Sequence, residues 1–382
     1  MKEYAVDVCG NNFCKNGEDI CGDSYKVFHN QDSTVVVLSD GLGSGVKANV
    51  LSTLTVEIVG GLMSGDLSTH EVIETLIASL PVCKSRGIAY STFSILRIYD
   101  HGQATLLEYD SPTALKIKGG EKVSSIIGSE IEVFGKLIRE SHFKINPGDM
   151  IMQISDGIVH AGIGATLRMG WQEEGIQSYL KHVAPLADGN PDKLANYVLK
   201  QAAELWLSNC GDDGTVVATK YRKAINAVII TGPAGEKRDT PKMIKEFLKT
   251  DGIKIVSGGT TSHLIADKLG QTLEVDMKYI DSGLPPTAKI KGVDLVTEGM
   301  LTLNRIVEYL KYGNQPCEEN AATKMLNILL ACDGIKFMVG TARNSAHQNA
   351  NFPPELLLRR TVVEAIVNLL KEKGKTVEIN YY

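Results

Sequence analysis

Two aspartates each follow a short β-prone run and stand in the tripeptide Ser-Asp-Gly. Asp40 comes directly after the run 35–39, and Asp156 comes directly after the run 150–155. A short apolar run predicts a buried strand, so both carboxylates should lie at the rim of a sheet. The glycine that follows each aspartate lets the backbone come close to whatever the carboxylate binds.

Two further aspartates stand where they could join this rim. Asp212 comes just before the strand expected over 215–220, and Asp23 precedes another short β-prone run. In an antiparallel sheet, the start of one strand lies beside the end of its neighbour. We therefore expect Asp23 and Asp212 to lie near Asp40 and Asp156.

Four converging carboxylates without positive neighbours repel one another, and a bound divalent cation is the usual resolution. A site with oxygen ligands alone favours Mg²⁺ or Mn²⁺ over Zn²⁺. The plain alternative is that Asp-Gly pairs are turn residues, which is the preferred interpretation of one isolated pair. Here the same context is repeated along the chain, which favours a metal site.

Four ordered motifs carry a resemblance to a known family. They are Gly22-Asp23-Ser24-Tyr25, Leu38-Ser39-Asp40-Gly41-Leu42-Gly43-Ser44-Gly45, Gln153-Ile154-Ser155-Asp156-Gly157 and Gly211-Asp212-Asp213-Gly214-Thr215. With these motifs the chain resembles the metal-dependent serine/threonine protein phosphatases of type 2C, and within them the branch of stage II sporulation protein E. The resemblance covers about residues 1–222, and the segment 90–94 with the hairpin up to Gly120 is also similar.

The resemblance implies an α+β fold, a four-layer αββα sandwich, with two Mn²⁺ or Mg²⁺ ions at the sheet edge. By motif match, Asp40 would bridge the two ions and the Gly41 carbonyl would bind one of them. Asp23, Asp156 and Asp212 would complete the catalytic carboxylate set. Two such ions lower the pKa of a shared water and neutralise charge on the phosphoryl oxygens during in-line displacement.

The resemblance also has departures. Asp213 stands where many relatives have Asn, and no Arg that would clamp the substrate phosphate is recognisable by motif. The family implies a phosphoprotein substrate, such as a phosphorylated anti-sigma factor antagonist. Two alternatives stay open: a pseudo-phosphatase that binds metal or ligand without turnover, and a small-molecule phosphatase.

The chain changes character near Lys223. From 1 to 222, short β-prone runs joined by turns predict an antiparallel sheet system. Helices interrupt it at 44–63, at 171–183, and at a segment where Asn190 is the expected N-cap and Pro191 the first helical residue. The pattern therefore predicts one domain over 1–222, which the resemblance implies is a phosphatase domain.

From 224 to 382, predicted strands and helices alternate regularly. Strands are expected at 227–230, 253–257, 293–296 and 335–340, each followed by a helical segment. This alternation favours an α/β domain with a doubly wound parallel sheet. We expect a second domain here, with a regulatory or ligand-sensing role.

Two loops of this second domain are candidates for binding a small anionic ligand that bears a phosphate or a carboxylate. Gly258, Gly259, Thr260 and Thr261 lie between a strand and a helix start, where free amides and the helix dipole attract anions. A tight turn with an N-cap is the equal alternative. A second polar loop, 341–349, contains Arg343 and His347, for which a solvated loop is the plain alternative.

Composition restricts the remaining possibilities. The 382 residues are 43% hydrophobic and 22% charged, as in soluble globular proteins. With 40 basic and 45 acidic residues, the net charge of −5 offers no basic field for nucleic acid. No secretory signal and no apolar run of bilayer length is visible, so we expect a cytoplasmic protein without a membrane partner. The oligomeric state stays open, with a homodimer as one option.

The cysteines indicate reduced thiols rather than disulfides. Seven cysteines are an odd number and are scattered along the chain. Cys9, Cys14 and Cys21 are clustered, but their spacing matches no zinc or iron–sulfur pattern. Cys21 and Cys210 lie beside the acidic motifs. We interpret both as packing thiols, because the two-metal chemistry needs no phosphoenzyme.

Overall fold

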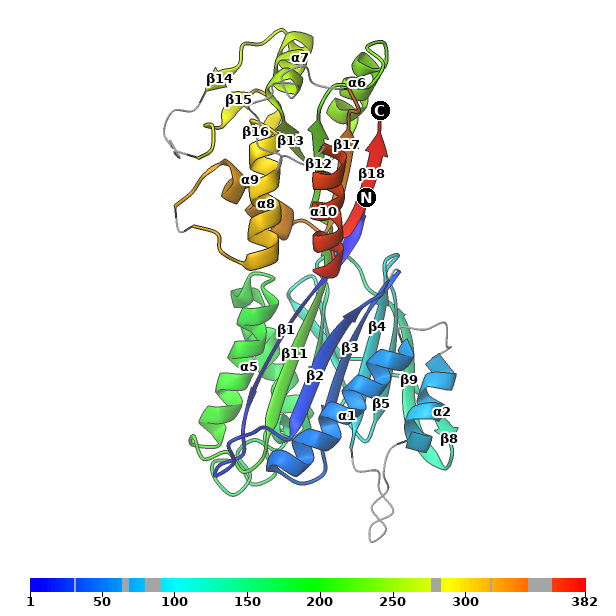
Figure 1. Ribbon diagram of the computed structural model, residues 1–382. Helices are drawn as coiled ribbons and strands as arrows, with labels where there is room; N and C mark the ends of the chain where they lie inside the picture. The colour runs from blue at the N-terminus through cyan, green and yellow to red at the C-terminus, as the bar shows by residue number, and fades with distance from the viewer. Residues whose placement is uncertain (31, 64–68, 80–90, 276–282, 317, 343–358) are drawn as a thin grey trace. The chain divides into compact units, whose positions relative to one another are not determined.

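The computed structural model describes residues 1–30, 32–63, 69–79, 91–275, 283–316, 318–342 and 359–382 (Figure 1). The chain divides into two compact units. One, called here the N-terminal unit, comprises Tyr4–Lys223. The other, the C-terminal unit, comprises Ala224–Tyr382 together with Met1–Glu3.

Two antiparallel sheets form the centre of the N-terminal unit. The six-stranded sheet has the order β2-β3-β4-β5-β9-β8, and the five-stranded sheet has the order β1-β11-β10-β6-β7. In the first sheet these strands are Asp23–His29, Ser33–Asp40, Phe93–Tyr99, Gln103–Tyr109, Lys136–Lys144 and Ser129–Val133. In the second they are Tyr4–Phe13, Gly214–Lys223, Met150–Ile154, Leu115–Lys118 and Lys122–Ser125.

Alternation along β3 shows how the layers are built. Val35 and Val37 pack with the helices α1 (Gly45–Met63) and α2 (Thr69–Ser79), whereas Val36 and Leu38 pack with residues of the second sheet. The other face of the second sheet is covered by α4 (Gln172–Val183) and α5 (Pro191–Leu205). The unit therefore has four layers: helices, sheet, sheet and helices.

Local signals determine where the helices begin. The Asn190 side chain accepts hydrogen bonds from the amides of Asp192 and Lys193, at 2.9 and 3.2 Å, and Pro191 is the first residue of α5. The predicted cap is thus confirmed. A short helix α3 (Asp156–Val159) and a 3₁₀ turn (Pro185–Ala187) complete this unit.

One helix in the described part of the chain, α1, is long and apolar enough to cross a membrane by length and composition alone. It carries the exposed charges Lys47 and Glu57. Its buried residues Val56, Val59 and Met63 pack on the six-stranded sheet. Core helices of soluble proteins have the same properties, so the feature is weak evidence for a membrane span.

A seven-stranded sheet forms the centre of the C-terminal unit, in the order β14-β15-β16-β13-β12-β17-β18. The five strands from β16 to β18 in this order pair in parallel, and β14 and β15 are antiparallel at one edge. In sheet order the strands are Glu274–Val275, Ala288–Ile290, Val293–Thr297, Ile253–Ser257, Asn226–Thr231, Gly334–Val339 and Thr376–Tyr381.

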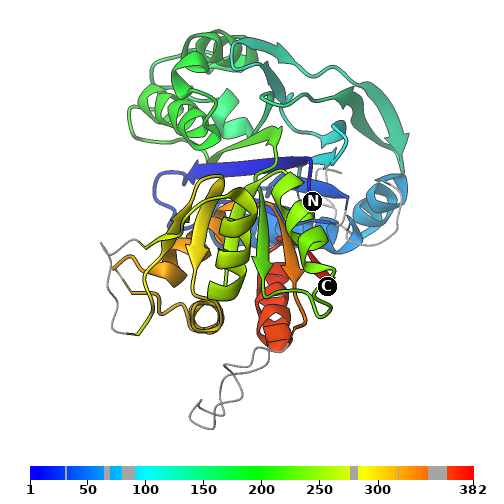
Figure 2. The same cartoon turned by 90° about the horizontal axis from the view of Figure 1, so that it is seen from above.

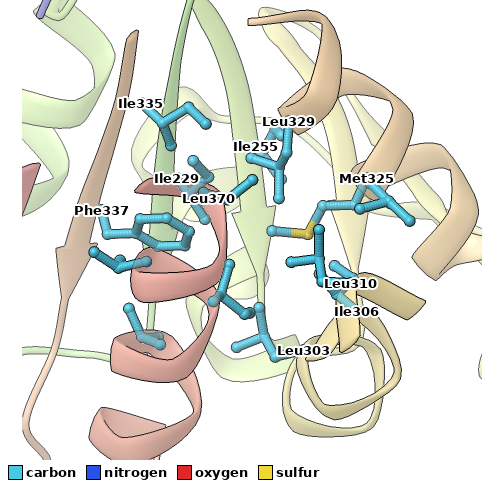
Figure 3. Packing of buried hydrophobic residues seen from close by; sticks show 14 of the residues in the cluster. Ile229, Ile255, Leu303, Ile306, Leu310, Met325, Leu329, Ile335, Phe337 and Leu370 are labelled. Carbon is cyan, nitrogen blue, oxygen red and sulfur yellow. The ribbon is translucent and has the colours of Figure 1, made fainter. Parts of the chain in front are cut away.

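Both faces of this sheet are covered, as the alternation along β12 shows. Ile229 packs with α8 (Met300–Tyr312), α9 (Ala321–Ala331) and α10 (Arg359–Glu372), whereas Val228 and Ile230 pack with α6 (Thr240–Lys249) and α7 (Gly259–Leu269). Figure 3 shows the first cluster, in which strand residues face Leu303, Met325 and Leu370 of the helices. Figure 2 follows this unit from above, from green to red.

The first residues of the chain, Met1–Glu3, belong with the C-terminal unit, whereas the sequence analysis placed them in the segment 1–222. The amide of Lys2 donates to the Asn226 side chain at 3.2 Å, and the Asn226 side chain donates back to the Lys2 carbonyl at 2.7 Å. The amide of Ala224 also donates to the Glu3 carbonyl, at 3.0 Å. These contacts join the start of the chain to the start of β12.

Candidate active site

Register places the first two aspartates side by side. β2 begins at Asp23 and β3 ends at Asp40, and the antiparallel pairing sets these two residues opposite each other. Asp23 is 3% exposed. The end of β3 is fixed from the other side by β4, where the amide of Thr92 donates to the Asp40 carbonyl at 2.9 Å. The two carboxylates therefore share one edge of the six-stranded sheet.

The second sheet brings Asp156 and Asp212 to its own edge. The end of β10 and the start of β11 are joined by Ser155 and Thr215: the Ser155 amide donates to the Thr215 carbonyl at 3.0 Å, and the Thr215 amide donates to Ser155 Oγ at 2.8 Å. α3 then begins with Asp156, and Asp212 lies just before β11.

Two glycines allow close backbone approach at this edge. A Cβ atom on Gly157 would lie 1.9 Å from the carbonyl oxygen of Asp213. A Cβ atom on Gly41 would lie 2.0 Å from the carbonyl oxygen of Ala48, at the start of α1. No side chain fits at these distances, so each Ser-Asp-Gly motif needs its glycine for packing as well as for any role of the carbonyl.

The edges of the two sheets meet, because a Cβ atom on Gly22, the residue before Asp23, would lie 2.8 Å from Asp213 Oδ2. Burial raises the pKa of Asp40 well above its ordinary value, and the nearby charges of Asp23 and Asp156 add to the rise. Burial also raises the pKa of Asp212, with a further contribution from Asp156. Burial also raises the pKa of Asp23, and the nearby charges of Asp213 and Asp156 add to the rise. The four predicted aspartates thus form one cluster, called here the acidic edge.

Unsatisfied oxygens test whether this edge fits a metal. Both carboxylate oxygens of Asp23, and Oδ2 of Asp213, are buried without a hydrogen-bond partner among the described residues. A buried carboxylate without partners is costly, and a divalent cation would satisfy it. In the described part of the chain, no three His, Cys, Asp or Glu side chains are already spaced as ligands around one point.

Asp213 has a structural role that its motif did not reveal. Its Oδ1 accepts a hydrogen bond from the Lys15 amide at 2.9 Å, and its own amide donates to Asp212 Oδ1 at 3.0 Å. It therefore ties the segment after β1 to the loop that carries Asp212. Asp213 supports the position of Asp212 whether or not it contacts an ion.

A cavity of about 460 Å³ adjoins the acidic edge at Asp156. Arg139 of β9 lines it and is opposite Glu108 of β5 in the sheet register. The Arg139 Nε donates to Glu108 Oε2 at 2.8 Å, and its Nη2 donates to the Ser111 carbonyl at 3.3 Å. The Glu108 side chain is 1% exposed, whereas that of Arg139 is 30% exposed. Arg139 is thus a cation held beside the site, which no motif indicated.

The cysteines near the acidic edge favour the packing interpretation. Cys21 and Cys210 are buried, and burial raises the pKa of both thiols. The Cys21 thiol donates to the Phe13 carbonyl at 3.6 Å. A thiol with a raised pKa holds its proton and is a poor nucleophile.

The candidate residues of the C-terminal unit are placed in part. Gly258 is the N-cap of α7, which has no side-chain cap, and Gly259, Thr260 and Thr261 form its first turn. All four line a small cavity of about 50 Å³. Arg343 and His347 lie outside the described residues.

Comparison with solved structures shows the class of the N-terminal fold. The chain is similar to the PP2C phosphatase domain of SpoIIE from Bacillus subtilis, solved with a fragment of the regulatory domain. The TM-score is 0.51 and the identity 20%, over 58% of this chain and 65% of that chain. The fold is therefore that of the PP2C phosphatases.

Two other solved structures are similar at lower scores. A Mycobacterium tuberculosis structure with RsbU and RsbW domains matches with a TM-score of 0.47 and 17% identity, over 58% of this chain and 62% of that chain. RsbX in complex with magnesium matches with a TM-score of 0.42 and 20% identity, over 58% of this chain and 97% of that chain. No curated protein matches the sequence significantly.

A family model for stage II sporulation protein E (SpoIIE) matches residues 30–222, just over half of the 382 residues. The chain therefore belongs to the stage II sporulation protein E (SpoIIE) family. The resemblance carried by the aspartate motifs is confirmed. Asp23 lies before the matched segment, and the β2–β3 register brings it to Asp40.

Proposed function

We propose that the N-terminal unit hydrolyses phosphoserine or phosphothreonine on a bacterial regulatory protein, using two Mn²⁺ or Mg²⁺ ions. The observation that carries the proposal is the acidic edge, where Asp23 has two buried carboxylate oxygens without a partner among the described residues. Family membership supports the reaction class.

The residues of the acidic edge take different parts in this proposal. Asp40, which feels the charges of both Asp23 and Asp156, would be shared between the two ions. Asp23, Asp156, Asp212 and the Gly41 carbonyl would supply the remaining protein ligands. When bound, such ions lower the pKa of a water molecule and offset charge on the phosphoryl oxygens. The Ser39 and Ser91 hydroxyls, 2.6 Å apart, hold the strand end that carries Asp40.

Arg139 would contact the substrate. It lines the cavity that borders Asp156, and its bond to buried Glu108 fixes the direction of the guanidinium. A guanidinium held in place by a carboxylate loses little freedom when it binds a phosphate oxygen or a peptide carbonyl. Arg139 therefore replaces the phosphate-binding Arg that the sequence motifs lack.

The substrate and the setting remain part of the proposal. A phosphorylated anti-sigma factor antagonist, or a similar phosphoprotein, is the substrate class that family membership favours. We place the reaction in the cytoplasm. The C-terminal unit would be a doubly wound α/β domain that regulates the phosphatase.

Hydrolysis of p-nitrophenyl phosphate by the full chain, with and without Mn²⁺, tests the proposal. Asp40→Asn and Asp156→Asn should each lose about a thousandfold in rate, because metal ions contribute several kcal/mol to the transition state. Asp32→Asn is the matched control, since Asp32 is exposed and precedes the opposite end of β3. Circular dichroism should show all variants folded.

Each other outcome selects one of the alternatives. A wild-type chain that stays inactive with Mn²⁺ on both p-nitrophenyl phosphate and phosphoproteins is a pseudo-phosphatase. Faster turnover on phosphorylated metabolites than on phosphopeptides indicates a small-molecule phosphatase.

A further inference from the structure

Three neighbouring parallel strands of the C-terminal unit end in a row of hydroxyl residues. The register pairs Thr231 of β12 with Ser257 of β13, and Ser257 with Thr297 of β16. All three residues are at most 2% exposed. The hydroxyls of Ser257 and Thr297 have no hydrogen-bond partner among the described residues. Because an unpartnered buried hydroxyl costs free energy, a ligand that bonds to these hydroxyls would gain binding energy.

The small cavity of about 50 Å³ lies at the end of these strands, where α7 and α8 begin. Gly258 and Gly299 precede the two helices with φ of 134° and 141°, and neither helix has a side-chain bond from its N-cap residue. The first intrahelical bond of α7 runs from the Ser262 amide to the Gly258 carbonyl. The amides of 259–261 therefore have no intrahelical acceptor, the arrangement by which a helix start attracts an anion.

Thr261 adds a second group that points to a ligand. Its residue is 2% exposed, lines the cavity, and has a hydroxyl without a partner among the described residues. Ser257 lines the same cavity, is also buried, and also has a hydroxyl without a partner among the described residues. Two buried, unsatisfied hydroxyls thus face the helix start.

Arg359 supplies a positive charge to this cavity. Its Nη1 donates to the Gly340 carbonyl at 2.8 Å. The same atom would lie 2.2 Å from a Cβ atom on Gly232, so the guanidinium packs directly against this glycine. Within the described part of the chain, no carboxylate pairs with it; burial alone lowers the pKa of its guanidinium. A partly buried cation without a counter-ion is stabilised by a bound anion.

The carboxylate that lines the cavity is already engaged. Glu298 Oε2 accepts a hydrogen bond from the Leu301 amide at 3.1 Å, in the first turn of α8. Glu298 therefore caps the start of α8. The part of the cavity formed by the start of α7 and Arg359 is the part that suits an anion.

We propose that this cavity binds a phosphoryl group, as inorganic phosphate or as the phosphate of a small metabolite. The amides of 259–261, the hydroxyls of Ser257 and Thr261, and the Arg359 guanidinium would hold its oxygens. The volume suits a single oxyanion rather than a whole cofactor, so the rest of a metabolite would extend outside. The site does not rest on the proposed hydrolysis, because none of its residues belongs to the acidic edge.

Isothermal titration calorimetry of the full chain with inorganic phosphate, and separately with AMP, tests the site. EDTA in the buffer removes divalent ions, so that binding at the acidic edge does not contribute. Arg359→Gln and Thr261→Val should each weaken binding about tenfold, the effect of losing one hydrogen bond to a charged group. Asp40→Asn should bind as wild type does. Tighter binding of AMP than of phosphate would identify a metabolite as the source.

Thr302→Val is the matched control. Thr302 also has a buried hydroxyl without a partner among the described residues, but it does not line the cavity. Ser257→Ala and Thr302→Val should both raise the melting temperature of the ligand-free chain, and Ser257→Ala alone should weaken phosphate binding. The proposal is overturned if neither phosphate nor AMP binds, or if the cavity variants bind as tightly as Thr302→Val.

Discussion

Both units have a row of polar residues at the ends of neighbouring strands. The two rows differ in the charge of the ligand that they would attract. At the acidic edge the unsatisfied groups are carboxylate oxygens, with Asp23 the clearest case. At the strand ends of the C-terminal unit they are hydroxyls, with Arg359 as a cation that no described carboxylate pairs with. The first arrangement fits a cation and the second an anion. The type of unsatisfied group, more than the fold, indicates the charge of the ligand.

The two arginines at these sites differ in their hydrogen-bond partners. Arg139 is paired with buried Glu108, whereas Arg359 donates to backbone carbonyls. Arg139→Gln leaves the buried Glu108 carboxylate without its positively charged partner and should cost about 3 kcal/mol of unfolding free energy at neutral pH. Arg359→Gln leaves no such charge and should cost about 1 kcal/mol. Urea unfolding of both variants measures the difference, and equal losses would remove this distinction.

The pH dependence of Arg139→Gln sharpens the same contrast. Burial raises the pKa of Glu108, and Arg139 opposes that rise. Without Arg139 the pKa rises further, so the folded state holds the proton more tightly than the unfolded state does. The variant should therefore be nearer to wild type in stability at acidic pH and lose stability as pH rises toward neutral. A loss that does not change between acidic and neutral pH would contradict this assignment.

The acidic edge depends on backbone contact, which Gly157→Ala should break. Its Cβ would meet the Asp213 carbonyl at 1.9 Å, and overpacking of this kind costs about 1–3 kcal/mol. Gly61→Ala in α1 is the control, because a Cβ there meets nothing within 4 Å and a helical Gly→Ala change is stabilising. Chemical unfolding should show opposite signs for the two variants. A neutral Gly157→Ala would mean that the two strand ends are not held this closely.

The smallest effects should appear when one unsatisfied group is neutralised in each unit. Asp23→Asn and Ser257→Ala should each stabilise the ligand-free chain by about 1 kcal/mol, because an unpartnered buried group is removed or loses its charge. Differential scanning fluorimetry in EDTA measures both. Added Mn²⁺ should then stabilise Ser257→Ala as it does wild type, and Asp23→Asn much less. Equal responses to Mn²⁺ would break the contrast between the two edges.

The acidic edge could be predicted from the sequence because each of its aspartates is marked by a short run of neighbouring residues. Asp40 and Asp156 follow buried strand runs, and a strand end places the next residue at a rim whatever the rest of the fold does. The pairing of Asp23 with Asp40 needed only one short hairpin.

The residues that sequence reasoning missed depend on contacts between distant segments. Arg139 meets Glu108 through the register of β5 and β9, 31 positions apart, and neither residue stands in a motif. Arg359 reaches the cavity of Ser257 from a helix about a hundred residues further along the chain. The change of composition near Lys223 likewise could not predict the hydrogen bond between Lys2 and Asn226.

Titration of the metal-free full chain with Mn²⁺ by calorimetry tests most directly the claim that the acidic edge is a cation site. We expect wild type to bind two ions, Asp40→Asn to lose binding at both sites because Asp40 would be shared, and Asp32→Asn to bind as wild type does. Binding that is unchanged in Asp40→Asn, or no binding by wild type, would contradict it.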